Sequence, residues 1–185
     1  MEVAGLVLAA GGGRRYGMPK ALVRSGDRLW VERAADTLVA AGCDDVLVVL
    51  GAAADQVRAA APTLRYVDNP DWPTGIASSL RAGLVALAGT GAVAAVILLV
   101  DMPGVTAAAV RRIAAHAAPG ALVIGGYGER RGHPVLLGRD HWAGAAAAAT
   151  GDRGARDYLR ANADSVRVVP VGDVADDTDI DTDID

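Results

Sequence analysis

Residues 8–22 read LAAGGGRRYGMPKAL and join an apolar run, typical of a buried strand, to a loop that opens with three consecutive glycines. Glycines let the backbone take conformations that are closed to other residues, and successive N–H groups can then surround an anion. Arg14, Arg15 and Lys20 place three positive charges within seven residues of this loop. The stretch therefore predicts a loop that binds a polyphosphate.

The loop fits neither of two common phosphate-binding patterns. A Walker A loop carries Lys directly after its second glycine, followed by Ser or Thr, whereas here Met18 follows Gly17 and Ala21 follows Lys20. A dinucleotide loop of the form G-x-G-x-x-G needs a third glycine where this chain has Tyr16. The remaining alternative is a glycine-rich surface turn with solvated arginines. The apolar run before the loop disfavours it, because such a run is typical of a buried strand.

The composition predicts a single domain, residues 1–185, because 185 residues with 52% hydrophobic content can form a sizeable core. The formal net charge of −4 argues against general nucleic-acid binding. Cys43 is the single cysteine, which excludes an internal disulfide and fits a reducing compartment. Neither a signal peptide nor a membrane-spanning stretch is recognisable, so we expect a cytoplasmic protein that binds no membrane.

Strand-like and helix-like runs alternate along the whole chain, which predicts an α/β fold. The strands are apolar on both sides, as in a mainly parallel sheet with helices on both faces. In such sheets the ligand lies beyond the carboxyl ends of the strands. The expected strands are 3–9, 46–50, 64–67, 94–100, 121–124, 135–137 and 166–169, and the expected helices are 29–41, 53–61, 76–87, 106–116, 140–149 and 152–161.

Asp101 follows the most apolar of these strands and precedes Met102 and Pro103. A carboxylate at the carboxyl end of a buried strand is a natural ligand for Mg²⁺, which prefers one or two carboxylates together with substrate phosphates. An Asp that simply starts a turn before a proline is the alternative. Because the glycine loop is expected at the same edge of the sheet, the metal site is favoured.

Three further segments are candidates for ligand binding. The segment 69–80, NPDWPTGIASSL, enters a helix through Gly75, and its Asn69, Ser78 and Ser79 either line a nucleotide pocket or cap that helix. His133, in GHPV at 132–135, and Arg153, in GDRGAR at 151–156, either contact a second substrate or have structural roles.

The acidic end of the chain carries seven Asp residues in 173–185. A charge run of this kind is usually a solvated tail. An EF-hand loop is disfavoured, because it needs Gly at its sixth position and Glu at its twelfth.

Taken together, these motifs resemble the MobA/MocA-like nucleotidyltransferases. Residues 8–20 are similar to the family signature L-A-(A/G)-G-x-(S/G)-x-R-M-G-x-x-K, with Tyr16 in place of Met. The segments N-P-x-W, DMP, GHPV, GDRGAR and DIDT follow in the family order, although Asp183 replaces a proline after DIDT. The resemblance implies a three-layer α/β/α Rossmann-like fold. It also implies that Mg²⁺ is the cofactor, and that an acceptor phosphate attacks the α-phosphorus of a nucleoside triphosphate and releases pyrophosphate.

The resemblance also implies roles for individual residues. Arg15, Lys20 and Asp101 are the expected catalytic residues, and Asp101 with Asp179 is expected to hold the metal, Asp181 being an alternative to Asp179. His133 and Arg153 are expected to bind the acceptor. The expected nucleotide-binding residues are Leu8, Ala9, Ala10, Gly11, Gly12, Gly13, Arg14, Arg15, Lys20, Asn69, Gly75, Ser78 and Ser79.

Ala10 is the residue on which the choice of nucleotide depends. In the family, L-A-A-G is typical of molybdopterin cytidylyltransferases and L-A-G-G of guanylyltransferases, so CTP is expected and GTP is the alternative. Molybdopterin is the expected phosphate-bearing acceptor, with a sugar or polyol phosphate as the alternative, and a molybdoenzyme or a chaperone is implied as partner protein. A nucleotide-binding regulator without turnover is the alternative from a different class, which the joint presence of Arg15, Lys20 and Asp101 disfavours.

Overall fold

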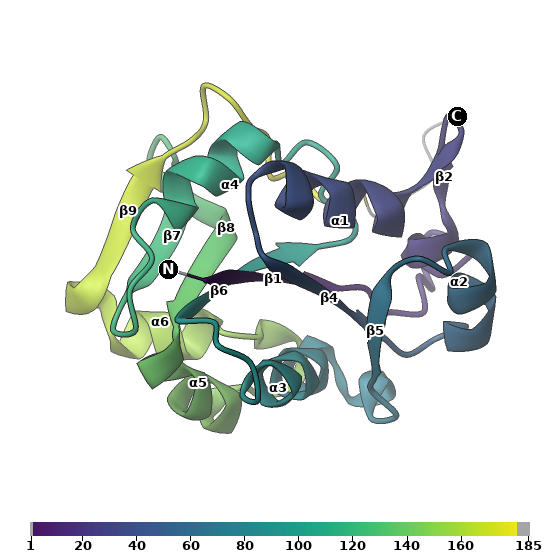
Figure 1. The fold of residues 1–185 in the computed structure, drawn as a ribbon, viewed down its shortest axis with the longest axis horizontal. Helices are drawn as coiled ribbons and strands as arrows, with labels where there is room; N and C mark the ends of the chain where they lie inside the picture. The colour runs from purple at the N-terminus through teal and green to yellow at the C-terminus, as the bar shows by residue number, and fades with distance from the viewer. Residues whose placement is uncertain (1, 181–185) are drawn as a thin grey trace.

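The computed structural model describes residues 2–180, and its central layer is a seven-stranded sheet (Figure 1). The strand order is β5-β4-β1-β6-β8-β7-β9. Strand β8 runs antiparallel to both β6 and β7, and the other neighbouring pairs are parallel. The strands are β1 (Val3–Leu8), β4 (Asp45–Leu50), β5 (Arg65–Asp68), β6 (Ala94–Leu99), β7 (Leu122–Tyr127), β8 (Arg130–Gly138) and β9 (Val166–Pro170).

Helices cover both faces of this sheet, which confirms the three-layer α/β/α architecture (Figure 1). Helices α1 (Trp30–Ala40) and α4 (Ala107–Ala114) lie on one face, and α3 (Ile76–Leu87), α5 (Trp142–Ala148) and α6 (Arg156–Ala161) lie on the other. The shorter helix α2 (Ala54–Ala60) lies near the β5 edge. A small ribbon of β2 (Arg24–Ser25) and β3 (Arg28–Leu29) and five 3₁₀ turns complete the described chain: η1 (Lys20–Leu22), η2 (Trp72–Thr74), η3 (Arg139–His141), η4 (Gly151–Arg153) and η5 (Ala163–Ser165).

The core consists of two apolar layers, one on each face of the sheet. Successive side chains of a strand point to opposite faces, and β1 supplies both layers. Its Val7 packs in the same cluster as Leu38 of α1, whereas Leu6 packs in the cluster that contains Leu84 of α3. Because both faces are covered, the strands read as continuous apolar runs, and this is why their positions were predictable from the sequence.

The structure differs from the expected elements in two places that matter for function. The expected helix 152–161 is divided, because Gly154 takes a φ of 52° between η4 and α6. The glycine-rich stretch 125–132, which lies between the expected strands 121–124 and 135–137, is largely part of β7 and β8, and these form a hairpin with a tight turn at Gly128. Glycine has a low propensity for strands, and the pairing of β7 with β8 outweighs it here.

Within residues 2–180, no helix combines the length and the apolar character that crossing a bilayer requires.

Candidate functional site

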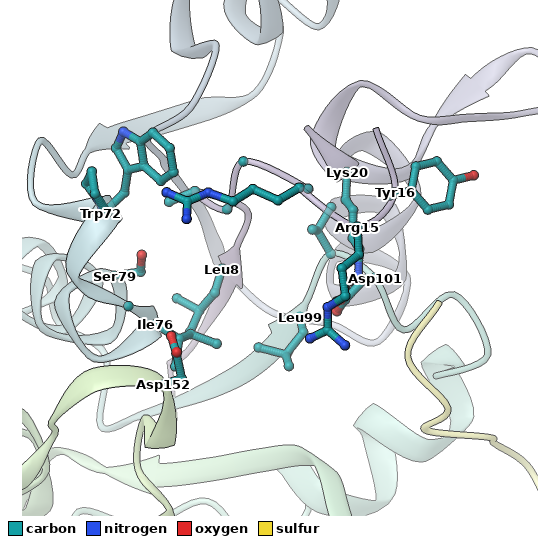
Figure 2. A pocket seen from close by; sticks show the side chains of 18 residues that line it. Leu8, Arg15, Tyr16, Lys20, Trp72, Ile76, Ser79, Leu99, Asp101 and Asp152 are labelled. Carbon is teal, nitrogen blue, oxygen red and sulfur yellow. Dashed lines mark hydrogen bonds and ion pairs between the residues drawn. The ribbon is translucent and has the colours of Figure 1, made fainter. Parts of the chain in front are cut away.

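A cleft of about 570 Å³ opens where the carboxyl ends of β1 and β6 meet (Figure 2). The loop that follows β1 forms one wall, and the segment 72–79 forms another. Figure 2 shows Arg15, Lys20 and Asp101 at one end of the cleft and Trp72, Ser79 and Asp152 at the other. The cleft therefore has a cationic end suited to phosphates and a second end bounded by an aromatic ring and short polar side chains.

The loop is held in shape by its own backbone. The N–H of Gly17 donates to the carbonyl of Gly13 at 2.8 Å, and this turn requires a φ of 58° at Gly13. A side chain at Gly13 would also collide with the carbonyl of Met18. The glycine is therefore needed for the turn that carries Arg14 and Arg15 into the cleft.

Most of the expected nucleotide-binding residues line the cleft, and three do not. Ala9 is buried behind the loop, where its N–H donates to the carbonyl of Val49 at 3.0 Å. Asn69 and Ser78 are also buried, and the Asn69 amide donates to the Ser78 hydroxyl at 2.8 Å and to the Ser79 hydroxyl at 3.0 Å. These contacts fix the segment that leads into α3. The residues that line the cleft are Leu8, Ala10, Gly11, Gly12, Gly13, Arg14, Arg15, Lys20, Gly75 and Ser79.

Lys20 and Asp101 form an ion pair at the cationic end, with 2.8 Å between Nζ and Oδ2. Their side chains are 12% and 20% exposed, so the pair is shielded from water on most sides. Lys20 comes from the turn η1 after the glycine loop, and Asp101 from the residues after β6. Residues 81 positions apart in the sequence thus meet because β1 and β6 are neighbouring parallel strands.

The acidic tail folds back to this same end of the cleft. The N–H of Asp176 donates to the carbonyl of Gly104 at 3.1 Å, and the N–H of Ile180 donates to the carbonyl of Asp101 at 3.0 Å. Asp177 is buried and pairs with Arg130 at 3.1 Å. Asp179, exposed and next to Ile180, is therefore carried towards Asp101. Asp181, Thr182 and Asp183 lie outside the described residues.

A second pocket, of about 650 Å³, adjoins the cleft and shares Leu8, Ile76, Leu99 and Asp152 with it. We call it the adjoining pocket. Its lining includes both expected acceptor-binding residues, His133 and Arg153. The Arg153 guanidinium is engaged elsewhere, because it lies 3.0 Å from the Thr150 hydroxyl and 3.1 Å from a carboxylate oxygen of Asp157.

The surroundings of His133 favour its neutral form. Burial lowers the pKa of His133 to about 4, and the positive charge of Arg156 adds to this effect, while Asp177 and Asp101 oppose it. At neutral pH the imidazole can therefore form hydrogen bonds in the adjoining pocket without adding a positive charge.

Trp72, Asp152 and Arg156 are among the pocket residues that were not singled out from the sequence. Trp72 packs over Gly51 and Gly12, where side chains would collide with its ring or come unusually close to it. Asp152 lies beside Gly75 and lines both pockets, and Arg156 lines the adjoining pocket. All three lie in segments that the motifs had identified, but only the tertiary structure shows which side chains face the pockets.

The model of the MobA-like NTP transferase domain matches residues 5–166, which include the glycine loop, Asp101 and the adjoining pocket's β-hairpin. The chain belongs to the MobA-like NTP transferase domain family. The expected family and its fold are thereby confirmed.

The chain is also similar to individual proteins over nearly its whole length. The chain is 36% identical over 190 residues to nicotine blue oxidoreductase of Paenarthrobacter nicotinovorans, an alignment that covers 97% of this chain and 92% of that protein. The crystal structure of Rv0371c from Mycobacterium tuberculosis H37Rv superposes with a TM-score of 0.84 at 31% identity, covering 98% of this chain and 94% of that one. The structure of Rv0371c in complex with manganese has a TM-score of 0.79 at 30% identity and covers 97% and 94% of the two chains.

Proposed function

We propose that this protein transfers a nucleoside monophosphate from a nucleoside triphosphate, CTP, to the phosphate of an acceptor, molybdopterin, and releases pyrophosphate. The observation that carries the proposal is the Lys20–Asp101 pair at the cationic end of a cleft lined by the glycine loop. A cation and a metal-binding carboxylate are both needed where negative charge develops on transferring phosphoryl groups.

The chain's own residues would hold the triphosphate in the cleft. Backbone N–H groups of the glycine loop face its oxygens, and Arg14 and Arg15 add positive charge along the same wall. Lys20 donates to Asp101 in the structure, and in the complex its ammonium would turn to the phosphates. An acceptor oxygen then attacks the α-phosphorus while the bond to the pyrophosphate oxygen breaks. An acceptor that is already a phosphate monoester needs little or no general base for this attack.

The residues present fit a divalent cation of the Mg²⁺ type. Among residues 2–180, no group of three or more acidic, His or Cys side chains is placed to hold a metal. Asp101 and a tail carboxylate, with Asp179 as the described candidate, would form a site that phosphate oxygens complete, which is the mode Mg²⁺ prefers. When bound, the cation would offset negative charge on the phosphates. The manganese complex of Rv0371c supports a divalent metal in this family.

The choice of base rests on Ala10, which lines the cleft. The sequence L-A-A-G at residues 8–11 resembles the cytidylyltransferases of the family, so CTP is proposed, with GTP as the alternative. His133 and Arg153 are the proposed contacts for the acceptor. A sugar or polyol phosphate is the alternative to molybdopterin.

An oxidoreductase is a second candidate, because the chain aligns over 97% of its length with nicotine blue oxidoreductase. A redox reaction on an organic substrate would use the same two pockets and would not require Lys20 and Asp101 to handle a triphosphate. A nucleotide-binding regulator would bind the triphosphate in the cleft and show neither activity.

One assay series separates these functions. Pyrophosphate release is measured with CTP, GTP, ATP and UTP, each with Mg²⁺ and molybdopterin, and consumption of nicotine blue is measured with NADH and with NADPH. Asp101→Asn and the exposed control Asp164→Asn are tested beside the parent. We expect pyrophosphate release that is highest with CTP, that Asp101→Asn removes and that Asp164→Asn retains. Consumption of nicotine blue without pyrophosphate release would refute nucleotidyl transfer.

A further inference from the structure

Residues 171–180, which follow β9, have neither helix nor strand, and we call them the tail segment. The tail segment passes α4 (Figure 1), where the Thr106 hydroxyl donates to the carbonyl of Val174 at 2.8 Å. It ends at the cationic end of the cleft, where the N–H of Ile180 donates to the carbonyl of Asp101 at 3.0 Å. The tail segment therefore has a defined path from the β9 edge of the sheet to Asp101.

Two glycines outside the tail segment let it lie close to the rest of the protein. A Cβ atom at Gly104 would come within 2.6 Å of the carbonyl oxygen of Asp176. A Cβ atom at Gly132 would collide with the carboxylate of Asp177. Neither glycine has a positive φ, so what these two positions supply is room for the tail segment and not an unusual backbone conformation.

The carboxylate of Asp177 is held by the β7–β8 hairpin. Its side chain is 7% exposed, and one of its oxygens lies 3.1 Å from the guanidinium of Arg130. The Arg130 guanidinium also lies over the ring of Tyr127, at 5.5 Å from the ring centre, and the Tyr127 hydroxyl donates to the carbonyl of His133 at 2.5 Å. The hairpin therefore carries a built seat for one carboxylate, with Gly132 as its floor.

This seat accepts the tail segment in one register. A shift of one residue in one direction would bring Thr178, which has no charge, over Gly132. A shift in the other direction would bring Asp176, whose carboxylate already accepts from the N–H and the hydroxyl of Thr178 at 2.9 and 2.6 Å. A buried ion pair contributes little net stability, because desolvation offsets its attraction, and setting a register is the best-attested use of such a pair.

We propose that Asp177 is a positioning residue whose pairing with Arg130 fixes the register of the tail segment. Because Ile180 bonds to Asp101 only in this register, the pair also sets Asp179 beside Asp101. The inference rests on the proposed function for the divalent cation that Asp101 and Asp179 would share. Asp177 itself does not touch the cation and acts only through the position of Asp179.

Two measurements that need no turnover test this inference. Hydrogen exchange at the Ile180 amide reports docking of the tail segment in the ligand-free protein. Binding of Mn²⁺, followed by electron paramagnetic resonance with a non-hydrolysable CTP analogue, reports whether Asp179 is in place. The variants are Asp177→Asn, Asp179→Ala and the two combined. Asp173→Asn is the matched control, because it removes the same charge from the tail segment at a more exposed ion pair, with Arg112.

A second pair of variants alters the seat without changing any charge. Gly132→Ala puts a Cβ atom where the Asp177 carboxylate lies, whereas the Cβ atom of Gly89→Ala meets no other atom within 4 Å. We expect Gly132→Ala to speed exchange at Ile180 as Asp177→Asn does, and Gly89→Ala to exchange like the parent. Thermal melting of each variant shows that it is folded at the temperature of the assay.

We expect Asp177→Asn to speed exchange at Ile180 by about tenfold to a hundredfold, the scale of losing a hydrogen bond to a charged group. Asp173→Asn should change this rate little, because exposed ion pairs contribute little. The Kd for Mn²⁺ should rise about threefold to tenfold in Asp177→Asn, since only the docked fraction offers Asp179 to the metal. In the Asp179→Ala background, Asp177→Asn should not raise the Kd further, because the two residues act as one unit.

Unchanged exchange at Ile180 in Asp177→Asn would overturn the inference, as would an equal effect of Asp173→Asn. An additional rise in the Kd for Mn²⁺ in the Asp179→Ala background would also overturn it, because Asp177 would then act on the cation by its charge and not through Asp179. The proposed function fails differently. If exchange at Ile180 depends on Asp177 but no triphosphate releases pyrophosphate, the register assignment stands and nucleotidyl transfer is refuted.

Discussion

Replacing Lys20 by Met removes one charge from the Lys20–Asp101 pair while keeping a side chain of similar length. The two side chains are 12% and 20% exposed, so the pair is intermediate between a surface pair and a buried one. Surface pairs contribute about 0–1 kcal/mol, and breaking a buried pair costs about 3–5 kcal/mol. We therefore expect Lys20→Met to lower the free energy of unfolding by about 1–2 kcal/mol, because Asp101 is left with a charge that water only partly solvates.

The same substitution should affect turnover more strongly than stability. Loss of one preorganised donor at a site of developing negative charge lowers kcat by about a hundredfold to a thousandfold. The assay is pyrophosphate release at saturating Mg²⁺ and CTP, measured together with urea unfolding of the same preparations. The double variant Lys20→Met/Asp101→Asn should regain most of the lost stability and none of the lost activity, because both partners of the pair are then neutral.

If Lys20→Met turns over at nearly the parent rate, Lys20 does not take part in the reaction. A double variant no more stable than Lys20→Met would show that the pair is not what stabilises this end of the cleft. Either result would refute the argument from the 2.8 Å contact.

Three further predictions concern the metal, the base and His133. Asp101→Ala should abolish activity at any practical Mg²⁺ concentration. Asp179→Ala and a deletion from Asp176 onwards should instead raise the Mg²⁺ concentration that activity requires, since ordering an acidic tail carries an entropic cost that ligand binding offsets. If activity of the deletion variant depends on Mg²⁺ as the parent's does, the tail does not take part in metal binding. Ala10→Gly should shift preference from CTP towards GTP, and identical CTP/GTP ratios of kcat/KM would contradict a role in base choice. Burial lowers the pKa of His133 from 6.5 to about 4, so the unfolded chain takes up the proton at a higher pH than the folded protein, and the free energy of unfolding falls as the pH drops from 6.5 to 4. In His133→Asn, the slope of the free energy of unfolding against pH, measured by urea unfolding across this range, should be smaller by up to about 1.4 kcal/mol per pH unit. An unchanged slope would exclude His133 as the source of this pH dependence.

The sequence by itself determined the layers of the fold and the position of the nucleotide loop. Strands β1, β4 and β6 are buried on both faces and read as continuous apolar runs, and the glycines after β1 mark a turn that few other residues can form. Because parallel strands deliver their carboxyl ends to one edge, Lys20 and Asp101 were expected at the same site before any contact was known.

The tertiary structure decided which side chains of each motif face a pocket. Asn69 and Ser78 lie in the expected segment, yet their polar groups bond to the protein itself, and no local pattern encodes that choice. In GDRGAR, the motif does not distinguish Arg153 from Arg156, and only the position of Asp157 on α6 shows which guanidinium is already engaged. Spacing along the chain fixes where a segment turns, whereas the backbone path through the turn decides which of its side chains meet, as for Arg153 and Asp157, which are four residues apart. Pairs as distant in sequence as Lys20 and Asp101 become neighbours only when the sheet forms.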